Sequence, residues 1–354
     1  MSIFNVLSMI GGLALFLFGM HVMGESLTKA SGGRLEKILE KLTSNKLLAV
    51  VLGAGVTAII QSSSATTVMV VGFVNSGIMK LSQAVGVIMG ANVGTTITAW
   101  LLSLVGLEGD SLIVQLFKPE SFTPILALFG VILLMFSKKE KNHDIGSILL
   151  GFAVLMFGMS TMSEAVEPLA DVPEFTAILT TFTNPVLGVL AGTALTAIIQ
   201  SSSASVGILQ ALSVTGVIDY RMALPIIMGQ NIGTCITAMI SSIGTTKNAR
   251  RAALIHLYFN IIGSTVFLVL FYTANAFMKF AFLDEPANAL GIAVIHSIYN
   301  IFATCILLPF SDGLVKLSCL TIRDSAEEAK LNAAESDFQV LDARFLDTPP
   351  IATA

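Results

Sequence analysis

The chain has 354 residues, of which 54% are hydrophobic and only 12% are charged, and its mean hydropathy is +0.84. Soluble domains carry about a quarter charged residues, so this composition predicts a protein that crosses a membrane several times. The net charge of −4 argues against nucleic acid as a partner.

Apolar runs long enough to cross a bilayer follow one another along the chain. They lie near residues 3–24, 82–104, 122–137, 146–165, 222–243, 252–273 and 289–309. A span needs about 20 apolar residues, so the run at 122–137 is marginal. No basic segment precedes the first run, which favours a retained transmembrane helix over a signal peptide. Residues 310–322 are amphipathic, and from Arg323 the chain turns polar and charged.

One polar stretch interrupts these runs twice. Thr57–Ala65 reads Thr-Ala-Ile-Ile-Gln-Ser-Ser-Ser-Ala, and the same nine residues return at Thr196–Ala204. The apolar segments on either side are too short to span, and they lie at 47–60 and 66–79, then at 186–199 and 205–217. Non-helical backbone at membrane depth is tolerated only where it faces protein or a water-filled cavity. Each stretch therefore predicts a re-entrant helical hairpin, with Gln61–Ser64 as the first tip and Gln200–Ser203 as the second tip.

Both stretches belong to one internal duplication with an offset of 139 residues, without a gap between residues 12–99 (the first copy) and 151–238 (the second copy). A second motif recurs at the same offset. Residues 88–99 and 227–238 are identical at nine of twelve positions and share the pattern Gly-x-Asn-x-Gly-Thr. Glycines permit a helix to unwind, so this motif predicts a broken transmembrane helix in each copy.

The two copies are expected to have opposite orientations in the membrane. Three predicted crossings separate their starts, and an odd number turns the second copy upside down. Residues 25–46 carry five Lys and Arg, whereas the equivalent residues 164–185 carry none. Cytoplasmic loops hold an excess of Lys and Arg, so the N-terminus is predicted outside and the C-terminus in the cytoplasm. We thus expect an all-α polytopic membrane protein with repeats at 1–140 and 141–310 (the latter with additional helices), and a cytoplasmic tail at 311–354.

The tips of the two hairpins would meet near the middle of the membrane. At each tip one helix begins, with free N–H groups suited to an anion, and another ends, with carbonyls suited to a hard cation such as sodium. Taken singly, a Ser-Ser-Ser run is typical of a helix cap, and Gly-x-Asn-x-Gly of tight helix packing. Their joint recurrence favours a transporter's binding site. We expect no Lys or Arg there, so co-bound cations must help to hold the anion.

Two histidines lie within predicted spans and share a His-x-x-x-Asn pattern, His256 with Asn260 and His296 with Asn300. Ionisable residues inside the membrane are functional candidates by default. A His and an Asn four residues apart could also simply bond across a helix interface. We expect these four residues to support the site from behind.

The paired Gln-Ser-Ser-Ser and Gly-x-Asn-x-Gly-Thr motifs resemble the type II sodium–phosphate cotransporter family, in its bacterial branch. The resemblance covers residues 1–310 and implies a sodium-dependent phosphate transporter. It implies that phosphate is bound by Gln61, Ser62, Ser63, Ser64, Gln200, Ser201, Ser202, Ser203, Asn92 and Asn231. It implies sodium ligands among Ser64, Thr66, Asn92, Thr95, Thr96, Ser203, Ser205, Asn231 and Thr234. Residues 341–350 resemble the lead-in to the PhoU-like cytoplasmic domain of many bacterial members.

One departure from the family concerns charge movement. Electrogenic animal members carry a His-Asp-x-x-Asn segment after the first repeat, whereas Leu257 and Ser297 follow the two histidines here. We therefore expect electroneutral coupling.

The resemblance implies a secondary active transporter that couples inward sodium movement to uptake of inorganic phosphate across a bacterial inner membrane. Its partners would be phosphate, sodium and the lipid bilayer, with no organic cofactor, and its oligomeric state stays open, a dimer included. Two alternatives remain, a sodium-coupled carboxylate transporter and a membrane phosphate sensor or scaffold without transport. An enzyme is the weakest option, because no nucleophile–base pair, metal spacing or nucleotide loop is found in the sequence.

Overall fold

The computed structural model describes residues 3–31, 45–106, 115, 118–168, 172–174 and 181–324. These residues are almost wholly helical, and their one β-type pairing is an isolated bridge between Asp219 and Pro286. Six of their helical segments are long and apolar enough to cross a membrane, namely Ile3–Ala30, Leu81–Gly106, Glu140–Val166, Tyr220–Ser241, Lys247–Met278 and Ala289–Thr321. The prediction of an all-α polytopic membrane protein is confirmed.

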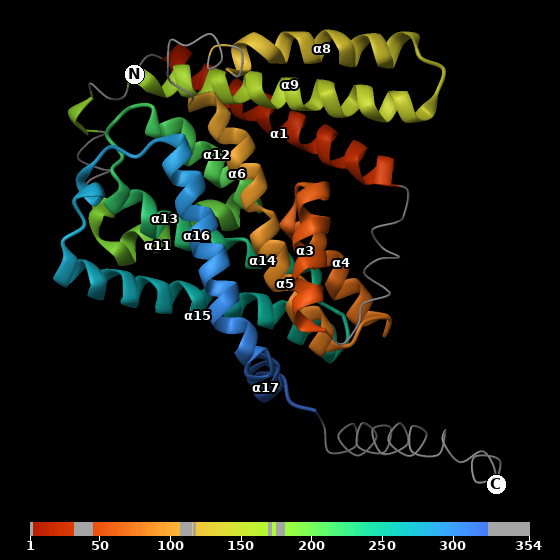
Figure 1. Cartoon of the computed structure of the whole chain (residues 1–354), viewed down its shortest axis with the longest axis vertical. Coiled ribbons are helices and arrows are strands. Elements are labelled where there is room, and N and C mark those ends of the chain that lie inside the picture. The colour runs from red at the N-terminus through yellow and green to blue at the C-terminus, as the bar shows by residue number, and fades with distance from the viewer. Residues whose placement is uncertain are drawn as a thin grey trace.

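The helices follow the duplication (Figure 1). The first half contains α1 (Ile3–Ser31), α3 (Lys46–Ile60), α4 (Ser63–Asn75), α5 (Leu81–Gly94), α6 (Thr96–Ser103), η1 (Leu104–Gly106) and α8 (Pro119–Phe136). The second half contains α9 (Glu140–Val166), η3 (Thr181–Thr183), α11 (Pro185–Ile199), α12 (Ser202–Ser213), α13 (Tyr220–Gly233) and α14 (Cys235–Ser241). The additional helices are α15 (Lys247–Met278), η4 (Ala281–Asp284), α16 (Ala289–Leu307), η5 (Leu308–Phe310) and α17 (Ser311–Thr321). The predicted tail beyond Asp324 and the basic residues Arg34, Lys37 and Lys41 lie outside the described residues.

Each Gln-Ser-Ser-Ser stretch joins two short helices, as the sequence predicts. α3 and α11 both have 15 residues, and each is capped at its start by an asparagine, Asn45 or Asn184, whose side chain accepts two backbone N–H bonds. Both helices end at a glutamine with φ 59°. Identical residues at matched positions thus impose the same start and the same end on both helices.

Glycines bring each of these helices into backbone contact with the next long helix. A Cβ on Gly90 of α5 would lie 2.0 Å from the Val50 oxygen of α3, and a Cβ on Gly229 of α13 would lie 2.0 Å from the Val189 oxygen of α11. Small residues at helix interfaces permit this close approach in membranes. The glycines of the second motif therefore serve packing.

The predicted break in these long helices is slight. α5 and α6 are separated by Thr95 alone, whose φ of −67° and ψ of −18° stay close to helical values. Thr234 separates α13 from α14 with φ −57° and ψ −27°. The expected unwinding at the glycines is thus limited to one residue, because the glycines are held against α3 and α11.

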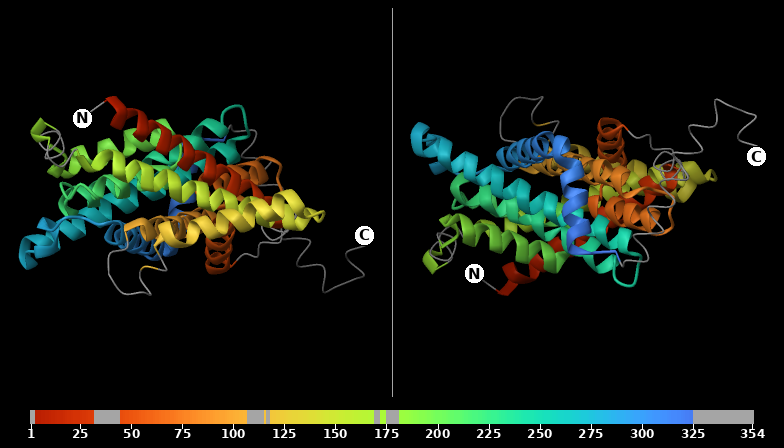
Figure 2. Two further views of the ribbon diagram at one scale, coloured as in Figure 1. Left: turned by 90° about the horizontal axis from the view of Figure 1, so that it is seen from above. Right: turned by 90° about the horizontal axis from the view of Figure 1, so that it is seen from below.

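The first helices of the two copies, α1 and α9, pack antiparallel at one edge of the molecule, and α8 packs on α9 (Figures 1 and 2). A Cβ on Gly12 would lie 2.9 Å from the Gly158 oxygen, and one on Gly19 would lie 2.6 Å from the Gly151 oxygen. Gly12 and Gly19 are the equivalents of Gly151 and Gly158 at the offset of the duplication. Gly12 of the first copy thus contacts the equivalent of Gly19, and Gly19 contacts the equivalent of Gly12. This reciprocal pattern is the one that a local twofold axis between α1 and α9 would produce. The membrane side that each complete copy faces stays a prediction.

Candidate functional site

Both tips have the same backbone turn. The N–H of Gln61 donates to the Thr57 oxygen and that of Gln200 to the Thr196 oxygen, each at 2.7 Å. The next residue, Ser62 or Ser201, is extended, and its hydroxyl accepts the N–H of Ala65 at 3.1 Å or of Ala204 at 3.2 Å. These two serines are therefore N-caps of α4 and α12, which is the role that the simpler interpretation gives to a serine run.

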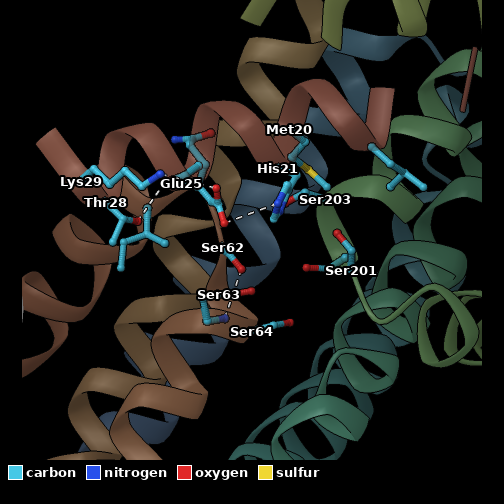
Figure 3. Close-up of a pocket in the computed structure, with 16 residues that line it drawn as sticks. Met20, His21, Glu25, Thr28, Lys29, Ser62, Ser63, Ser64, Ser201 and Ser203 are labelled. Atoms are coloured by element: carbon cyan, nitrogen blue, oxygen red, sulfur yellow. Dashed lines mark hydrogen bonds and ion pairs between the residues drawn. The ribbon is translucent and has the colours of Figure 1, made fainter. Parts of the chain in front are cut away.

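The two tips line one cavity of about 490 Å³ (Figure 3). From the first copy its lining includes Ile60, Gln61, Ser62, Ser63, Ser64 and Ala65, and from the second copy Ser201, Ser202 and Ser203. The N-termini of α4 and α12 thus open into the same space. Free N–H groups and the positive end of the helix dipole make such termini suitable for anions.

The two glutamines differ in their surroundings. Gln61 is buried, its Nε2 donates to the Ala58 oxygen, and its Oε1 accepts from Thr98 Oγ1 at 2.9 Å. Gln200 is exposed and lies outside the cavity lining, with its backbone oxygen accepting from Thr237 Oγ1 at 3.4 Å. The copies therefore contribute unequally to the cavity.

α1 provides a third wall of the cavity, which the sequence did not predict. Its lining residues are Leu17, Met20, His21, Gly24, Glu25, Thr28 and Lys29. Glu25 lies 3.5 Å from His21 Nε2 and 3.9 Å from Lys29 Nζ, one helical turn away on either side. The expectation of no Lys or Arg at the site is wrong, because α1 continues to Ser31 and carries Lys29 into the lining.

The Gly-x-Asn-x-Gly-Thr motif of the first copy supports both tips from outside the lining. Thr98 bonds Gln61 of the first tip, while Thr95 Oγ1 lies 3.4 Å from Ser203 Oγ of the second tip. Thr96 Oγ1 instead donates within its helix, to the Val93 oxygen at 2.7 Å. Thr95 and α6 of the first copy therefore contact both tips.

Asn92, on α5, is engaged by two residues of α15. Its Nδ2 donates to Asn260 Oδ1 at 3.1 Å, and its Oδ1 lies 3.3 Å from His256 Nε2. All three side chains are at most 2% exposed. The structure thus brings His256 and Asn260 to Asn92, and all three lie outside the cavity lining.

The equivalent residues of the second copy make contacts within their own helices. Asn231 Nδ2 donates to the Ile227 oxygen at 2.9 Å, and Thr234 Oγ1 to the Gln230 oxygen at 3.2 Å. On the additional helix α16, Asn300 Nδ2 likewise donates within its helix, to the His296 oxygen at 2.8 Å. Thr66 and Ser205 are fully buried and likewise lie outside the cavity lining.

Comparison with known proteins gives two matches to the family described as Na+/Pi-cotransporter, over residues 15–164 and 154–284, so each match contains one tip. The chain is 29% identical over 352 residues to the "Putative inorganic phosphate export protein YjbB" of Escherichia coli K12, covering 99% of this chain and 61% of that protein. It is 29% identical over 308 residues to the "Uncharacterized protein YqeW" of Bacillus subtilis, covering 87% of this chain and 95% of that protein.

A shorter match involves the "Sodium-dependent phosphate transport protein 2A" of Rattus norvegicus, with 35% identity over 98 residues, 27% of this chain and 15% of that protein. No solved structure matches the chain. The family matches extend over more than half of the sequence and include both tips. The chain therefore belongs to the Na+/Pi-cotransporter family.

Proposed function

We propose that the protein is a secondary active transporter that moves inorganic phosphate together with sodium ions across a bacterial inner membrane. Phosphate would bind between the two tips, and the direction under an inward sodium gradient would be uptake. The observation that carries this proposal is the cavity lined by both Gln-Ser-Ser-Ser tips, into which two helix N-termini open.

The chemistry of the lining suits phosphate. Ser63 and Ser64 lie in the first turn of α4, and Ser202 and Ser203 in the first turn of α12, so hydroxyl and backbone donors converge from both copies. Phosphate offers several acceptor oxygens to such donors. Lys29 adds a positive charge at the α1 wall, where its side chain is 69% exposed. Gln61 of the first tip adds an amide side chain to the lining.

The charge balance of the lining supports sodium coupling. The lining holds one lysine and one glutamate, His21 aside, so side chains alone do not neutralise a doubly charged anion there. Bound cations would complete the neutralisation, and anion binding would then depend on cation binding. The family description names sodium as the co-transported ion. The sodium ligands inferred from the resemblance remain part of this proposal.

A second candidate direction is export. The Escherichia coli relative carries the name of a putative phosphate export protein, and this chain spans 61% of its length. A symporter runs in either direction according to the summed gradients of its ions, so the same site serves both processes. The direction of phosphate transport therefore depends on the imposed ion gradients.

The test uses the purified protein in liposomes with labelled phosphate and imposed sodium gradients. Inward sodium should drive uptake, and outward sodium should drive release of preloaded phosphate. Uptake that is indifferent to sodium would contradict the coupling, and binding without flux would favour the sensor or scaffold. Inhibition by succinate rather than by arsenate would favour a carboxylate carrier.

Variants link that activity to the tips. Ser63→Ala and Ser202→Ala should each lower phosphate uptake strongly, because each removes a donor from the cavity. Ser76→Ala is the matched control, since this exposed hydroxyl donates to the Phe73 oxygen at 3.2 Å at the opposite end of α4. Unchanged kinetics in both tip variants would remove the tips from the site.

A further inference from the structure

Three buried oxygens of the second copy have no hydrogen-bond partner among the described residues. They are Thr196 Oγ1 on α11, Ser205 Oγ on α12 and Gln230 Oε1 on α13. All three residues have an exposure of 0%. Buried polar atoms in native proteins are nearly always paired with protein, water or an ion, so three on adjoining helices call for an occupant.

Gln230 connects α13 to α12 within this cluster. Its Nε2 donates to the Ser205 oxygen at 3.0 Å. A carbonyl only accepts, so the amide nitrogen must face it, and Oε1 on the same amide is left over beside Ser205. Thr196 stands in the last turn of α11, four residues before Gln200, and Ser205 in the first turns of α12. The cluster therefore lies directly behind the second tip.

In the first copy, the hydroxyls at the equivalent position are paired with each other. Thr57 and Thr66, the equivalents of Thr196 and Ser205, bond to each other through their hydroxyls at 3.0 Å. Thr66 Oγ1 also donates to the Ser62 oxygen at 3.1 Å. Ala91 stands where the second copy has Gln230. The second copy thus gains an oxygen and loses the hydroxyl pair at the same place.

We propose that Thr196, Ser205 and Gln230 hold one sodium ion, at a position that the first copy does not share. This inference rests on the proposed sodium-coupled transport and assigns one of its cations to a place. Two hydroxyls and an amide oxygen are neutral hard ligands, and all three can offer a lone pair to one cation at once. A water molecule could also bridge the three, donating to Gln230 Oε1 and accepting from the two hydroxyls, so the sodium dependence measured below distinguishes the two occupants. The C-terminal end of α11, where Thr196 lies, is also the negative end of that helix dipole.

The position explains how a cation would affect phosphate. Ser202 and Ser203 of the cavity lining precede Ser205 on the same helix, so a cation behind the tip would act on an anion in front of it. The ion would also connect α11, α12 and α13 at the point where the second tip forms. Sodium binding would therefore favour the tip geometry that receives phosphate.

The test measures phosphate uptake into proteoliposomes as a function of sodium concentration. Gln230→Ala and Ser205→Thr each install the residue of the first copy. Gln230→Ala should raise the sodium concentration for half-maximal uptake by about tenfold, as expected for the loss of one ligand to a charged group, and should lower the Hill coefficient for sodium. Ser205→Thr keeps a hydroxyl but should shift both quantities in the same direction, because that hydroxyl would pair with Thr196 as Thr66 pairs with Thr57 in the first copy. The phosphate KM at saturating sodium should stay unchanged. The matched control is Ser213→Ala, because that buried hydroxyl on the same helix donates to the Gln210 oxygen at 2.7 Å, away from the tip.

A second readout does not depend on transport. Sodium, compared with potassium, should raise the thermal unfolding midpoint of the detergent-purified protein without phosphate, because a ligand of the folded state stabilises it. The rise should be smaller in Gln230→Ala and in the conservative Ser205→Thr. Wild-type sodium sensitivity of uptake and of unfolding in both variants would overturn the inference and leave water as the occupant, while the proposed function would stand. Uptake by the wild type that ignores sodium would overturn the proposed function, whereas a sodium-specific stabilisation lost in Gln230→Ala would still support the site.

Discussion

At the scale of single residues, Gln61 and Gln200 hold a backbone conformation that favours glycine. Both have φ 59°, and both end a helix at its tip. A left-handed conformation costs a residue with a side chain about 1–2 kcal/mol. Gln61 offsets part of this through its side-chain bonds to Ala58 and Thr98. The side chain of Gln61 therefore makes two bonds that glycine could not make.

Replacement of Gln61 by glycine distinguishes the effect of the left-handed backbone conformation from the effect of the side chain. Gln61→Gly should keep the unfolding midpoint near that of the wild type, because glycine adopts this φ without strain. Gln61→Ala should be less stable than Gln61→Gly by about 1 kcal/mol. Phosphate uptake should fall in both, measured beside thermal unfolding in detergent. Equal stability of the two variants would contradict the strain, and full uptake by both would contradict a role for the side chain.

At the scale of elements, the contact between α3 and α5 depends on the absence of side chains. Gly90→Ala should lower the unfolding midpoint by an amount that corresponds to about 1–3 kcal/mol, because its Cβ would lie 2.0 Å from the Val50 oxygen. Gly229→Ala should do the same in the second copy. Gly55→Ala on α3 is the control, since no atom lies within 4 Å of its added Cβ. Equal stability of Gly55→Ala and Gly90→Ala would contradict the close packing.

A second element, α17, is fastened to α15 by a buried arginine. Arg251 is 3% exposed, donates to the Ile322 oxygen at 2.6 and 3.0 Å, and lies 2.8 Å from Asp324. Arg251→Lys should cost about 1.5–3 kcal/mol, because lysine cannot make this forked contact, and should speed hydrogen exchange near Ile322.

The control is Asp312→Asn, which removes the exposed ion pair with Lys46 at 2.8 Å. Such pairs are worth at most about 1 kcal/mol, so exchange near Ile322 should stay as in the wild type. Equal effects of the two variants would mean that the buried arginine does not fasten α17.

Comparison of sequence and structure shows which elements were predictable. The two tips were predictable from the sequence, because the duplication repeats a polar segment that only a turn between two helices accommodates. The α1 wall was not predictable. An apolar run shows which residues are compatible with lipid, but it does not show where the helix ends, and α1 continues past residue 24 to Ser31. The engagement of Asn92 by His256 and Asn260 depends on contacts between distant segments, which spacing along one chain does not reveal.

At the scale of the whole molecule, a duplicated sequence gives an asymmetric cavity. α1 lines it, whereas three of the equivalent positions on α9 are buried, although Glu164 and Glu167, the equivalents of Glu25 and Thr28, are exposed. Met156 and Met159, the equivalents of Leu17 and Met20, are at most 1% exposed. Ser163 is 7% exposed, and its hydroxyl has no hydrogen-bond partner among the described residues. If transport exchanges the conformations of inverted copies, α9 should line a cavity that opens on the opposite side, and Ser163 should be paired with water there.

Sided thiol labelling tests this exchange. Met20→Cys and Ser163→Cys would be made separately after replacing Cys235 by the threonine of the first copy, and Cys305 and Cys319 by serine. Met20→Cys should react with an impermeant reagent from the side to which the described cavity opens, and Ser163→Cys only from the other side. Conditions that slow one reaction should speed the other, because the two states share one population. Parallel changes at both positions, or labelling of both from one side, would mean that the copies do not exchange roles and that the α1 wall is a permanent feature of the site.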